Sequence, residues 1–194
     1  MMKMPSMFSF ILCSSEIVNI PNFLYKDTEL TVNVNINNYG FGLNKSTSLF
    51  AKAFQFSNDN YYFICFGDFY RSINEKYFQA LFNKYQPEQF LINILNEFTG
   101  SFSGIYFDKK KNEIFAFCDF LGFNKIYFCK FGDSILMCSS IWPICELMRQ
   151  NNTLEFDQSS IRDFILLGYP LGEKMFFKNI GLIQPGCIYK FSSE

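Results

Sequence analysis

The chain has 194 residues, of which 49% are hydrophobic and 18% are charged, and its formal net charge is −1. This length is enough for one sizeable domain that buries a core without metal or disulfide support. The composition excludes a disordered chain, and no apolar stretch is long enough to predict a membrane helix. With 17 basic and 18 acidic residues, the chain has no charged surface typical of nucleic-acid or membrane binding.

The sequence contains no histidine, which excludes imidazole as a general base, a proton shuttle or a metal ligand. Its seven cysteines are spread through apolar stretches and include no C-x-x-C pair. Free cysteine packs as a small hydrophobic residue, and the cytosol keeps it reduced. We therefore interpret the cysteines as buried structural thiols in a cytoplasmic protein, and we expect neither a metal nor a cofactor.

The apolar patterns predict strands first, then two helices, then a meander of short strands and two further helices. Alternation with a period of two identifies strands such as 30–36, in which Val32 and Val34 share one face. Pro87 suits the first turn of one helix, and Asp157 is suited to capping another. Because strand runs and helix runs are segregated, we predict an α+β fold with an antiparallel sheet. The predicted strands are 7–13, 30–36, 61–70, 102–107, 114–118, 125–128, 135–139 and 188–191, and the predicted helices are 75–85, 87–98, 143–149 and 158–167.

The first apolar stretch, 7–13, has two interpretations. A secretory signal peptide has an apolar segment of similar length after a basic start. This stretch carries Ser9 in its middle and lacks a small-x-small cleavage site, so a buried first strand is favoured. We find no internal repeat and no long linker, and we assign 1–194 to a single domain.

Five short motifs lie between Tyr61 and Tyr189: CFGDFY, GSFSGIYFD, CDFLGFNKIYF, CSSIWPI and FFKNIGLIQPG. In this order they resemble the class II glutamine amidotransferase domain of asparagine synthetases. The corresponding motifs of that family are, in order, G-x-F-A-x-x-x-x-D, R-D-x-x-G-x-x-P-L-Y-Y and a closing F-x-x-I-x-x-L-x-P-G. The resemblance implies a four-layer αββα sandwich of the N-terminal-nucleophile-hydrolase type, in which two antiparallel sheets lie between helices.

The resemblance also places a vestigial substrate site at Gly67, Asp68, Asp119 and Gly122. An alternative needs no substrate. An aspartate hydrogen-bonds to nearby backbone and a glycine supplies a positive φ, so Asp119 and Gly122 would simply shape a turn.

The reacting groups of the family have no counterpart here. The family's nucleophile is an N-terminal cysteine whose own amine acts as the base, whereas this chain begins Met-Met-Lys. Cys13 is a weak candidate, because a cut before it would remove the first predicted strand. Phe66 replaces the asparagine that donates to the oxyanion, and Cys118 replaces the arginine before Asp119. We therefore expect the chain to be a catalytically degenerate glutaminase domain.

In the resembled family this domain precedes an ATP-using synthetase domain marked by S-G-G-x-D-S, a motif absent from this sequence. β-Lactam synthetases and the cyclases that close lasso peptides keep a glutaminase-type domain as a packing partner. We thus expect the chain to bind an ATP-using synthetase or cyclase, or to self-associate. Two alternatives remain open: an active amidotransferase matured at Cys13 or using another nucleophile, and an unrelated domain whose aromatic strands enclose a small ligand.

Overall fold

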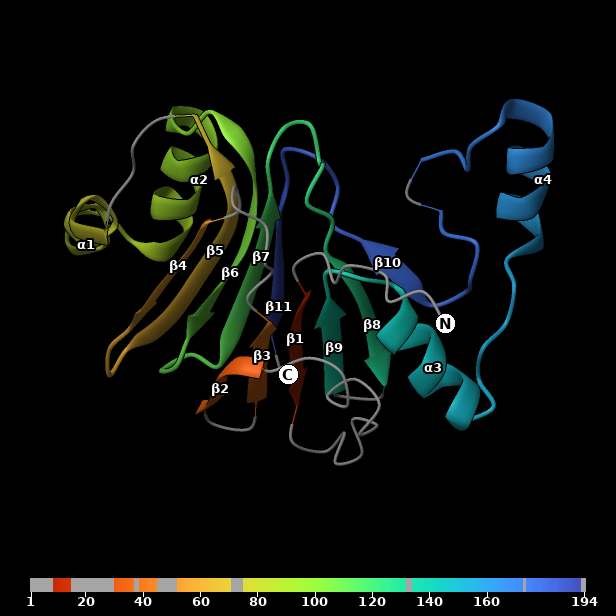
Figure 1. Cartoon of the computed structure of the whole chain (residues 1–194), viewed down its shortest axis with the longest axis horizontal. Helices are drawn as coiled ribbons and strands as arrows, with labels where there is room; N and C mark the ends of the chain where they lie inside the picture. Colours follow the sequence, from red (N-terminus) through yellow and green to blue (C-terminus); the bar gives the residue numbers. More distant parts are fainter. Residues whose placement is uncertain are drawn as a thin grey trace. The chain divides into compact units, whose positions relative to one another are not determined.

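The chain forms two antiparallel sheets and four helices in the residues that the computed structural model describes (Figure 1). This arrangement confirms the predicted α+β class. The stacking order of the layers stays a prediction. The described residues are 9–14, 30–36, 39–44, 52–70, 75–131, 134–172 and 174–192, with side chains described from Phe54 onward apart from Glu75 and Asn83.

Backbone contacts divide the chain into two compact units, and each unit combines two separate segments of the sequence. The first unit comprises Met1–Thr47 and Tyr127–Leu182, and the second comprises Ser48–Ile126 and Ile183–Glu194. Each unit contains one of the two sheets. The assignment of 1–194 to a single domain stays a prediction.

The sheet of the second unit has the strand order β11-β7-β6-β5-β4, and all neighbours are antiparallel. Polar side chains shape its two hairpin turns. Asn58 accepts a hydrogen bond from the N–H of Tyr61 at 2.9 Å, and Asp108 accepts from Lys110 and Lys111 at 3.0 and 3.1 Å. Such bonds to the following backbone favour a turn over a continued strand. The elements are β4 (Lys52–Ser57), β5 (Tyr61–Phe69), α1 (Glu75–Lys84), α2 (Pro87–Glu97), β6 (Gly100–Asp108), β7 (Glu113–Cys118) and β11 (Ile188–Ser192).

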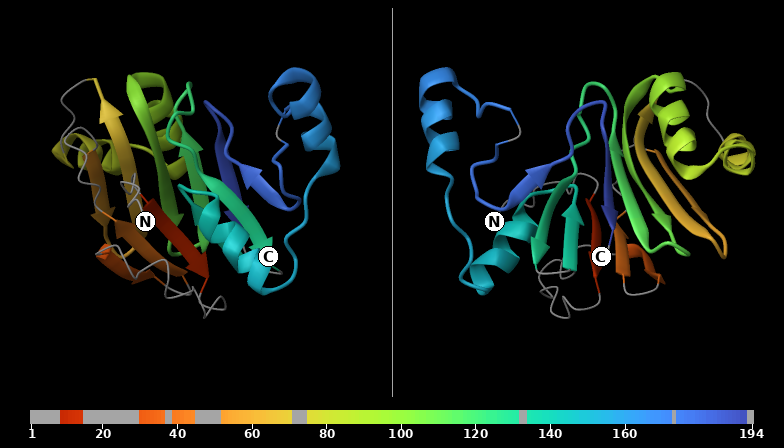
Figure 2. Two further views of the ribbon diagram at one scale, coloured as in Figure 1. Left: turned by 45° about the vertical axis from the view of Figure 1, so that its right-hand side comes forward. Right: turned by 180° about the vertical axis from the view of Figure 1, so that it is seen from behind.

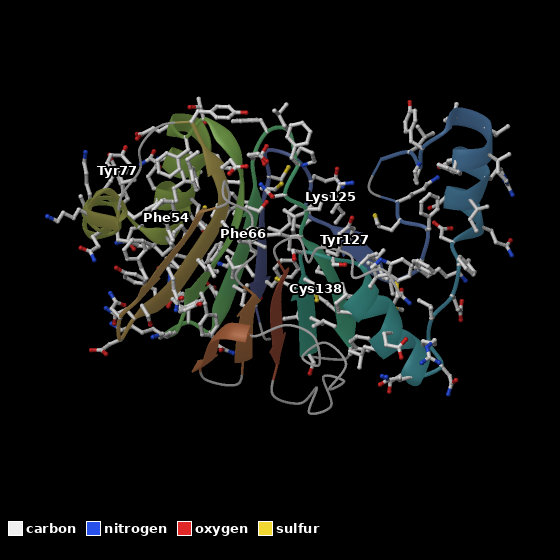
Figure 3. All side chains as sticks on the ribbon, viewed as in Figure 1. Phe54, Phe66, Tyr77, Lys125, Tyr127 and Cys138 are labelled. Carbon is white, nitrogen blue, oxygen red and sulfur yellow. The ribbon has the colours of Figure 1, made fainter. Side chains whose placement is uncertain are left out.

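Aromatic side chains fill the space between this sheet and helices α1 and α2. Phe54 of β4, labelled in Figure 3, has its ring centroid 5.2 Å from that of Phe78 on α1. Phe82 of α1 stacks on Phe90 of α2, with ring centroids 3.9 Å apart. Each fully buried phenylalanine contributes about 1.5–3 kcal/mol through removal of apolar surface from water. The opposite face of the sheet is buried as well, through Tyr62, Ile64, Phe66, Ser103, Ile105, Phe107, Ile114, Ala116 and Cys118.

The sheet of the first unit has the order β10-β8-β9-β1-β3-β2. Strand β1 is internal, because it pairs with β3 on one side and with β9 on the other. Helix α3 packs on this sheet (Figure 1), with Ile144 and Met148 in one apolar cluster with Leu136 and Cys138 of β9. Cys138 is labelled in Figure 3. The elements are β1 (Ser9–Ser14), β2 (Leu30–Ile36), β3 (Tyr39–Asn44), β8 (Tyr127–Phe131), β9 (Ser134–Cys138), α3 (Trp142–Gln150), α4 (Gln158–Leu167) and β10 (Ile180–Leu182).

Helix α4 differs from the other three in how little of it is buried. Figures 1 and 2 show it standing apart from strands β8 and β9 of its own unit, joined by extended segments. Ser160 is its only buried residue. The Asp157 side chain accepts from the N–H of Ser159 at 2.9 Å, which confirms the predicted cap, and Gly168 ends the helix with φ 84°.

Three described strands were not predicted from the sequence, and each has a local reason. β3 carries Gly40 and Gly42, which have low strand propensity. β10 has only three residues. β4 shows the alternation Phe54, Phe56, but it begins with Lys52 and Ala53, which have low strand propensity. The strand predicted at 125–128 begins instead at Tyr127.

Among the described residues, no helix combines the length and the apolar character needed to cross a membrane.

Candidate functional site

The Asp119 side chain extends the β6–β7 pairing beyond the last strand pair, Ser103 with Cys118. The Asp119 N–H donates to the carbonyl of Phe102 at 2.9 Å, and its carboxylate Oδ2 accepts from the N–H of Phe102 at 3.1 Å. A backbone carbonyl would normally take that second bond. The chain turns at Asp119, so its own carbonyl points elsewhere and the carboxylate substitutes for it.

The other carboxylate oxygen of Asp119 closes the turn that follows. Oδ1 accepts from the N–H groups of Leu121 at 2.7 Å and Gly122 at 3.0 Å. The residue is only 2% exposed. Each buried oxygen is thus bonded to backbone, as a charged group in a core requires. This arrangement leaves the Asp119 carboxylate engaged as a structural acceptor rather than open as a general base.

The turn at 119–122 interlocks with a second turn at 184–187. The Asp119 carbonyl accepts from the N–H of Gly186 at 2.9 Å. A Cβ added to Gly122, which has φ 63°, would lie 2.7 Å from Cγ of Pro185. A Cβ on Gly186, with φ 69°, would lie 2.8 Å from the Phe120 ring. Two of the motifs that carry the family resemblance therefore meet in space, and their glycines are required by close packing and positive φ.

Asn124 ties the same turn to the start of β6. Its amide Nδ2 donates to the carbonyl of Ser101 at 2.6 Å and to the Ser101 hydroxyl at 2.8 Å. The Asn124 carbonyl accepts from the buried hydroxyl of Ser103. Sequence reasoning did not single out Asn124, Ser101 or Ser103. A lone asparagine two residues after a glycine is an ordinary loop signal, and its partners are distant in sequence.

Gly67 lies where the backbone of β6 and the side chain of Asn124 approach closely. Its φ is 139°, and an added Cβ would lie 2.0 Å from the carbonyl oxygen of Ser101 and 3.0 Å from Nδ2 of Asn124. Its register partner in β6 is Phe102, the residue bonded to the Asp119 carboxylate. The structure thus brings Gly67, Asp119 and Gly122 to one end of this sheet.

Asp68 and Phe66 flank Gly67 but have different surroundings. Asp68 is exposed and pairs in register with Ser101. Phe66, which the sequence resemblance predicts at the position of the oxyanion donor, is 2% exposed and lies opposite Ala53 and Ser103. Its position in β5 is labelled in Figure 3. A buried phenylalanine offers packing and no hydrogen-bond donor.

Six cysteines lie in the described part of the chain with their side chains, and five of them are buried: Cys65, Cys118, Cys129, Cys138 and Cys145, with Cys187 half-buried. The predicted burial is confirmed for these five, whereas Cys187 is only partly buried. Burial raises the pKa of Cys118 to about 11, against smaller opposing effects such as its hydrogen bond to Ser103. Burial likewise raises the pKa of Cys129 to about 12 and that of Cys65 well above its usual range. A raised pKa suppresses the thiolate, which is the nucleophilic form.

These raised pKa values predict slow alkylation of the native protein. Near pH 8, a thiol of pKa about 11 is ionised in roughly one molecule in a thousand. We expect iodoacetamide to leave Cys118 and Cys129 unmodified in the folded chain, and to modify both after unfolding in guanidinium. Peptide mass mapping measures each site. Rapid native labelling of Cys118 would show an activated thiol in this cluster.

Cys13, the weak nucleophile candidate, lies in β1, and its side chain is outside the described residues. Its backbone pairs with Gly40 of β3 and with Leu136 of β9. A cut before Cys13 would remove Ser9–Leu12, which are four of the six strand residues. The cut would leave an internal strand of the sheet with two residues. Maturation at Cys13 would therefore remove most of the pairing that β1 makes with β3 and β9.

No group of three or more metal-ligating side chains occurs within the part of the chain that the structure describes.

No protein-family model matches this sequence, and no curated protein matches it. Among solved structures, the chain is similar to the glutamine phosphoribosylpyrophosphate (PRPP) amidotransferase of B. subtilis, solved with ADP and GMP. The two are 11% identical, with a TM-score of 0.45, over 96% of this chain and 43% of that chain. The chain thus spans less than half the length of that enzyme.

Proposed function

We propose that this chain is a glutaminase-type domain without glutaminase activity, and that it serves as the packing partner of an ATP-dependent amide-forming enzyme of the asparagine-synthetase kind, including a peptide-cyclising one. The observation that carries this proposal is the state of Asp119. Its carboxylate accepts from the N–H of Phe102 in β6 and from those of Leu121 and Gly122 in the turn, which a second family motif contacts through Gly186. These bonds give Asp119 a role in folding that needs no substrate.

The groups that would react are missing from the same region. Phe66 provides no donor for an oxyanion, and loss of one side-chain donor of this kind costs about 3–4 kcal/mol of transition-state stabilisation. The thiol of Cys118, the residue before Asp119, is held protonated by burial, which raises its pKa to about 11. Since nucleophile, oxyanion donors and substrate clamps act as a unit, a site lacking two of them does not hydrolyse glutamine.

Exposed apolar side chains favour an interaction role over a self-contained one. Phe120, Leu121 and Phe123 are all more than 60% exposed on the turn that Asp119 braces. A rigid turn loses little conformational freedom on binding, so its apolar tip is suited to packing against another protein. We place the complex in the cytoplasm, where the thiols stay reduced.

Ammonia release tests the loss of activity. We expect the purified chain to release no ammonia from glutamine above a blank without protein, and we expect Cys13→Ala to behave identically. Intact mass spectrometry checks that the chain still begins at Met1. Ammonia release that Cys13→Ala abolishes would contradict the proposal and favour an amidotransferase matured at that residue.

The partner role has its own test. Co-expression with an asparagine-synthetase-like enzyme from the same genome is expected to yield a stable complex on size exclusion. Charged substitution of Leu121 to glutamate should weaken that complex, whereas Ile92→Glu on α2 serves as a matched control. If no such complex forms, the packing-partner role is wrong even where glutaminase activity is absent.

A further inference from the structure

We propose that Cys118 and Cys187 form a reversible disulfide when a peroxide oxidises the chain, and that this bond holds the edge strand β11 to β7. The inference does not depend on the proposed function. It rests on the positions of the two thiols in the sheet of the second unit and on the difference in their exposure.

Cys118 and Cys187 lie opposite each other on neighbouring strands. β7 and β11 pair antiparallel (Figure 1), with Ile188 opposite Phe117. One residue further along, the Cys118 N–H donates to the Cys187 carbonyl at 3.3 Å, which continues this register. The α-carbons of opposite residues lie about 4.5–5.5 Å apart, and those of a disulfide lie about 4.4–6.8 Å apart. The backbone spacing therefore suits a disulfide.

The two thiols are on the same face of the sheet. Phe117 belongs to the aromatic cluster that packs against α1 and α2, and Ile188 packs against that cluster. Because side chains alternate along a strand, Cys118 and Cys187 both point away from these helices. Burial is the largest cause of the raised pKa of Cys118, and the Cys187 thiol adds to it. The two sulfur atoms are thus close enough to interact.

The pair has room to adjust at the end of the strand pairing. The Cys187 N–H donates to the carbonyl of Gln184 at 3.1 Å, within its own turn. The bond from Cys118 to Cys187, at 3.3 Å, is longer than the usual value of about 2.9–3.0 Å. β11 is the last strand on this side of the described sheet. Closing the disulfide brings the two Cβ atoms about 1 Å nearer than in an ordinary pair, which an edge strand can accommodate.

The difference in exposure sets the order of the reaction. Cys187 is half-buried, whereas Cys118 is 0% exposed, with its sulfur 3.5 Å from the Ser103 hydroxyl and 3.5 Å from the Asn124 carbonyl. A peroxide therefore reaches Cys187 first. The Cys187 thiolate attacks a peroxide oxygen and the O–O bond breaks. The hydroxide that leaves takes up the proton of the thiol, so the products are a sulfenic acid and one water.

Cys118 then completes the disulfide. Its sulfur attacks the Cys187 sulfur, the S–O bond breaks, and a second water leaves. The two thiols have then lost two protons and two electrons, and hydrogen peroxide has been reduced to two waters. Because the pKa of Cys118 is raised to about 11, about one molecule in 10⁴ carries its thiolate at pH 7. A well-oriented neighbouring group has an effective concentration of about 10⁵ M or more, which outweighs this small fraction.

The disulfide changes how β11 is held. The second unit consists of two separate segments of the chain, Ser48–Ile126 and Ile183–Glu194, and the bond joins them covalently. It closes a loop of about 70 residues, which restricts the unfolded chain. On the chain-entropy model, this raises the ratio of folded to unfolded molecules roughly 1,000-fold.

Treatment of the native full chain with hydrogen peroxide tests the pairing. We expect intact mass spectrometry to show the loss of two hydrogen atoms, and non-reducing peptide mapping to link Cys118 to Cys187. Dithiothreitol should restore both thiols. Cys129 and Cys145 are an internal control, because they share one apolar cluster but are both buried. They should stay reduced at the same dose, since the peroxide has no accessible first thiol there.

Single substitutions separate the two roles. In Cys118→Ser, Cys187 should still be oxidised but stop at the sulfenic acid, which dimedone labels. In Cys187→Ser, Cys118 should stay a thiol. Urea denaturation should show the roughly 1,000-fold gain on oxidation of the wild-type chain and no gain in Cys187→Ser. Hydrogen exchange of the β11 amides should slow on oxidation of the wild-type chain only.

Several outcomes would overturn the proposal. One is a Cys187 that does not react with peroxide in the native chain. Another is a Cys187 that passes to the sulfinic acid while Cys118 remains a thiol, which would show that the two sulfur atoms do not meet. A link from either residue to a different cysteine, or a disulfide that forms only in urea, would also contradict it.

Discussion

Replacing Asp119 with alanine is expected to lower the free energy of unfolding by about 3–5 kcal/mol, measured by urea denaturation. The substitution leaves the buried N–H of Phe102 without its acceptor, and an unsatisfied buried group costs about 1–3 kcal/mol. It also removes two bonds that close the turn, at Leu121 and Gly122. Bonds to a charged acceptor contribute about 1.5–3 kcal/mol each, and relief of the buried carboxylate offsets part of the loss.

Two variants sharpen this result. Asp119→Asn keeps one oxygen acceptor but replaces the other oxygen with an NH₂ donor that faces an N–H. We therefore expect it to lower the free energy of unfolding by less than Asp119→Ala does. Asp68→Ala serves as a control, because Asp68 is exposed and surface changes usually stay within about 0.5 kcal/mol. If Asp119→Ala kept the full stability of the chain, the structural interpretation of this residue would be wrong, and a role in binding would become the better account.

Gly67→Ala is the second substitution with a large expected effect. We expect it to lower the free energy of unfolding by about 3–5 kcal/mol or to prevent folding. The new methyl group would lie 2.0 Å from the carbonyl oxygen of Ser101 and 2.7 Å from the Cα of Phe102, both of which are backbone atoms. Backbone cannot rotate aside as a flexible side chain does, so β5 and β6 would have to separate locally. The φ of 139° adds strain of about 1–3 kcal/mol for any residue with a Cβ.

Gly172→Ala separates the two contributions. Gly172 also has a positive φ, 65°, but an added Cβ there meets nothing within 4 Å. We expect this control to lose only about 1 kcal/mol, which corresponds to backbone strain alone. Equal losses for the two variants, measured by the same urea titration, would show that close packing at Gly67 has no energetic weight.

The sequence by itself determined the elements whose signals are local. Pro87 begins α2 and Asp157 caps α4, because a fixed φ and a side-chain acceptor act within one turn of the helix. Alternation of apolar residues located β2 with the bounds that the structure has, Leu30–Ile36. The segregation of strand runs from helix runs gave the α+β class. Gly-rich β3 and the three-residue β10 escaped prediction, since their pairing comes from neighbouring strands rather than from their own residues.

Only the tertiary structure decided what the motif residues do. The sequence left Asp119 open between a substrate site and a turn, and the choice depends on Phe102 and Gly186, which are far away along the chain. The need for glycine at position 67 likewise arises from the approach of β6. The sequence Phe164–Leu167 predicts a helix whether these residues are buried or exposed, because apolar periodicity does not indicate which segment covers them. Adjacent residues determine local conformational preferences. Contacts between distant segments depend instead on strand register and packing, which arise only when the chain has folded.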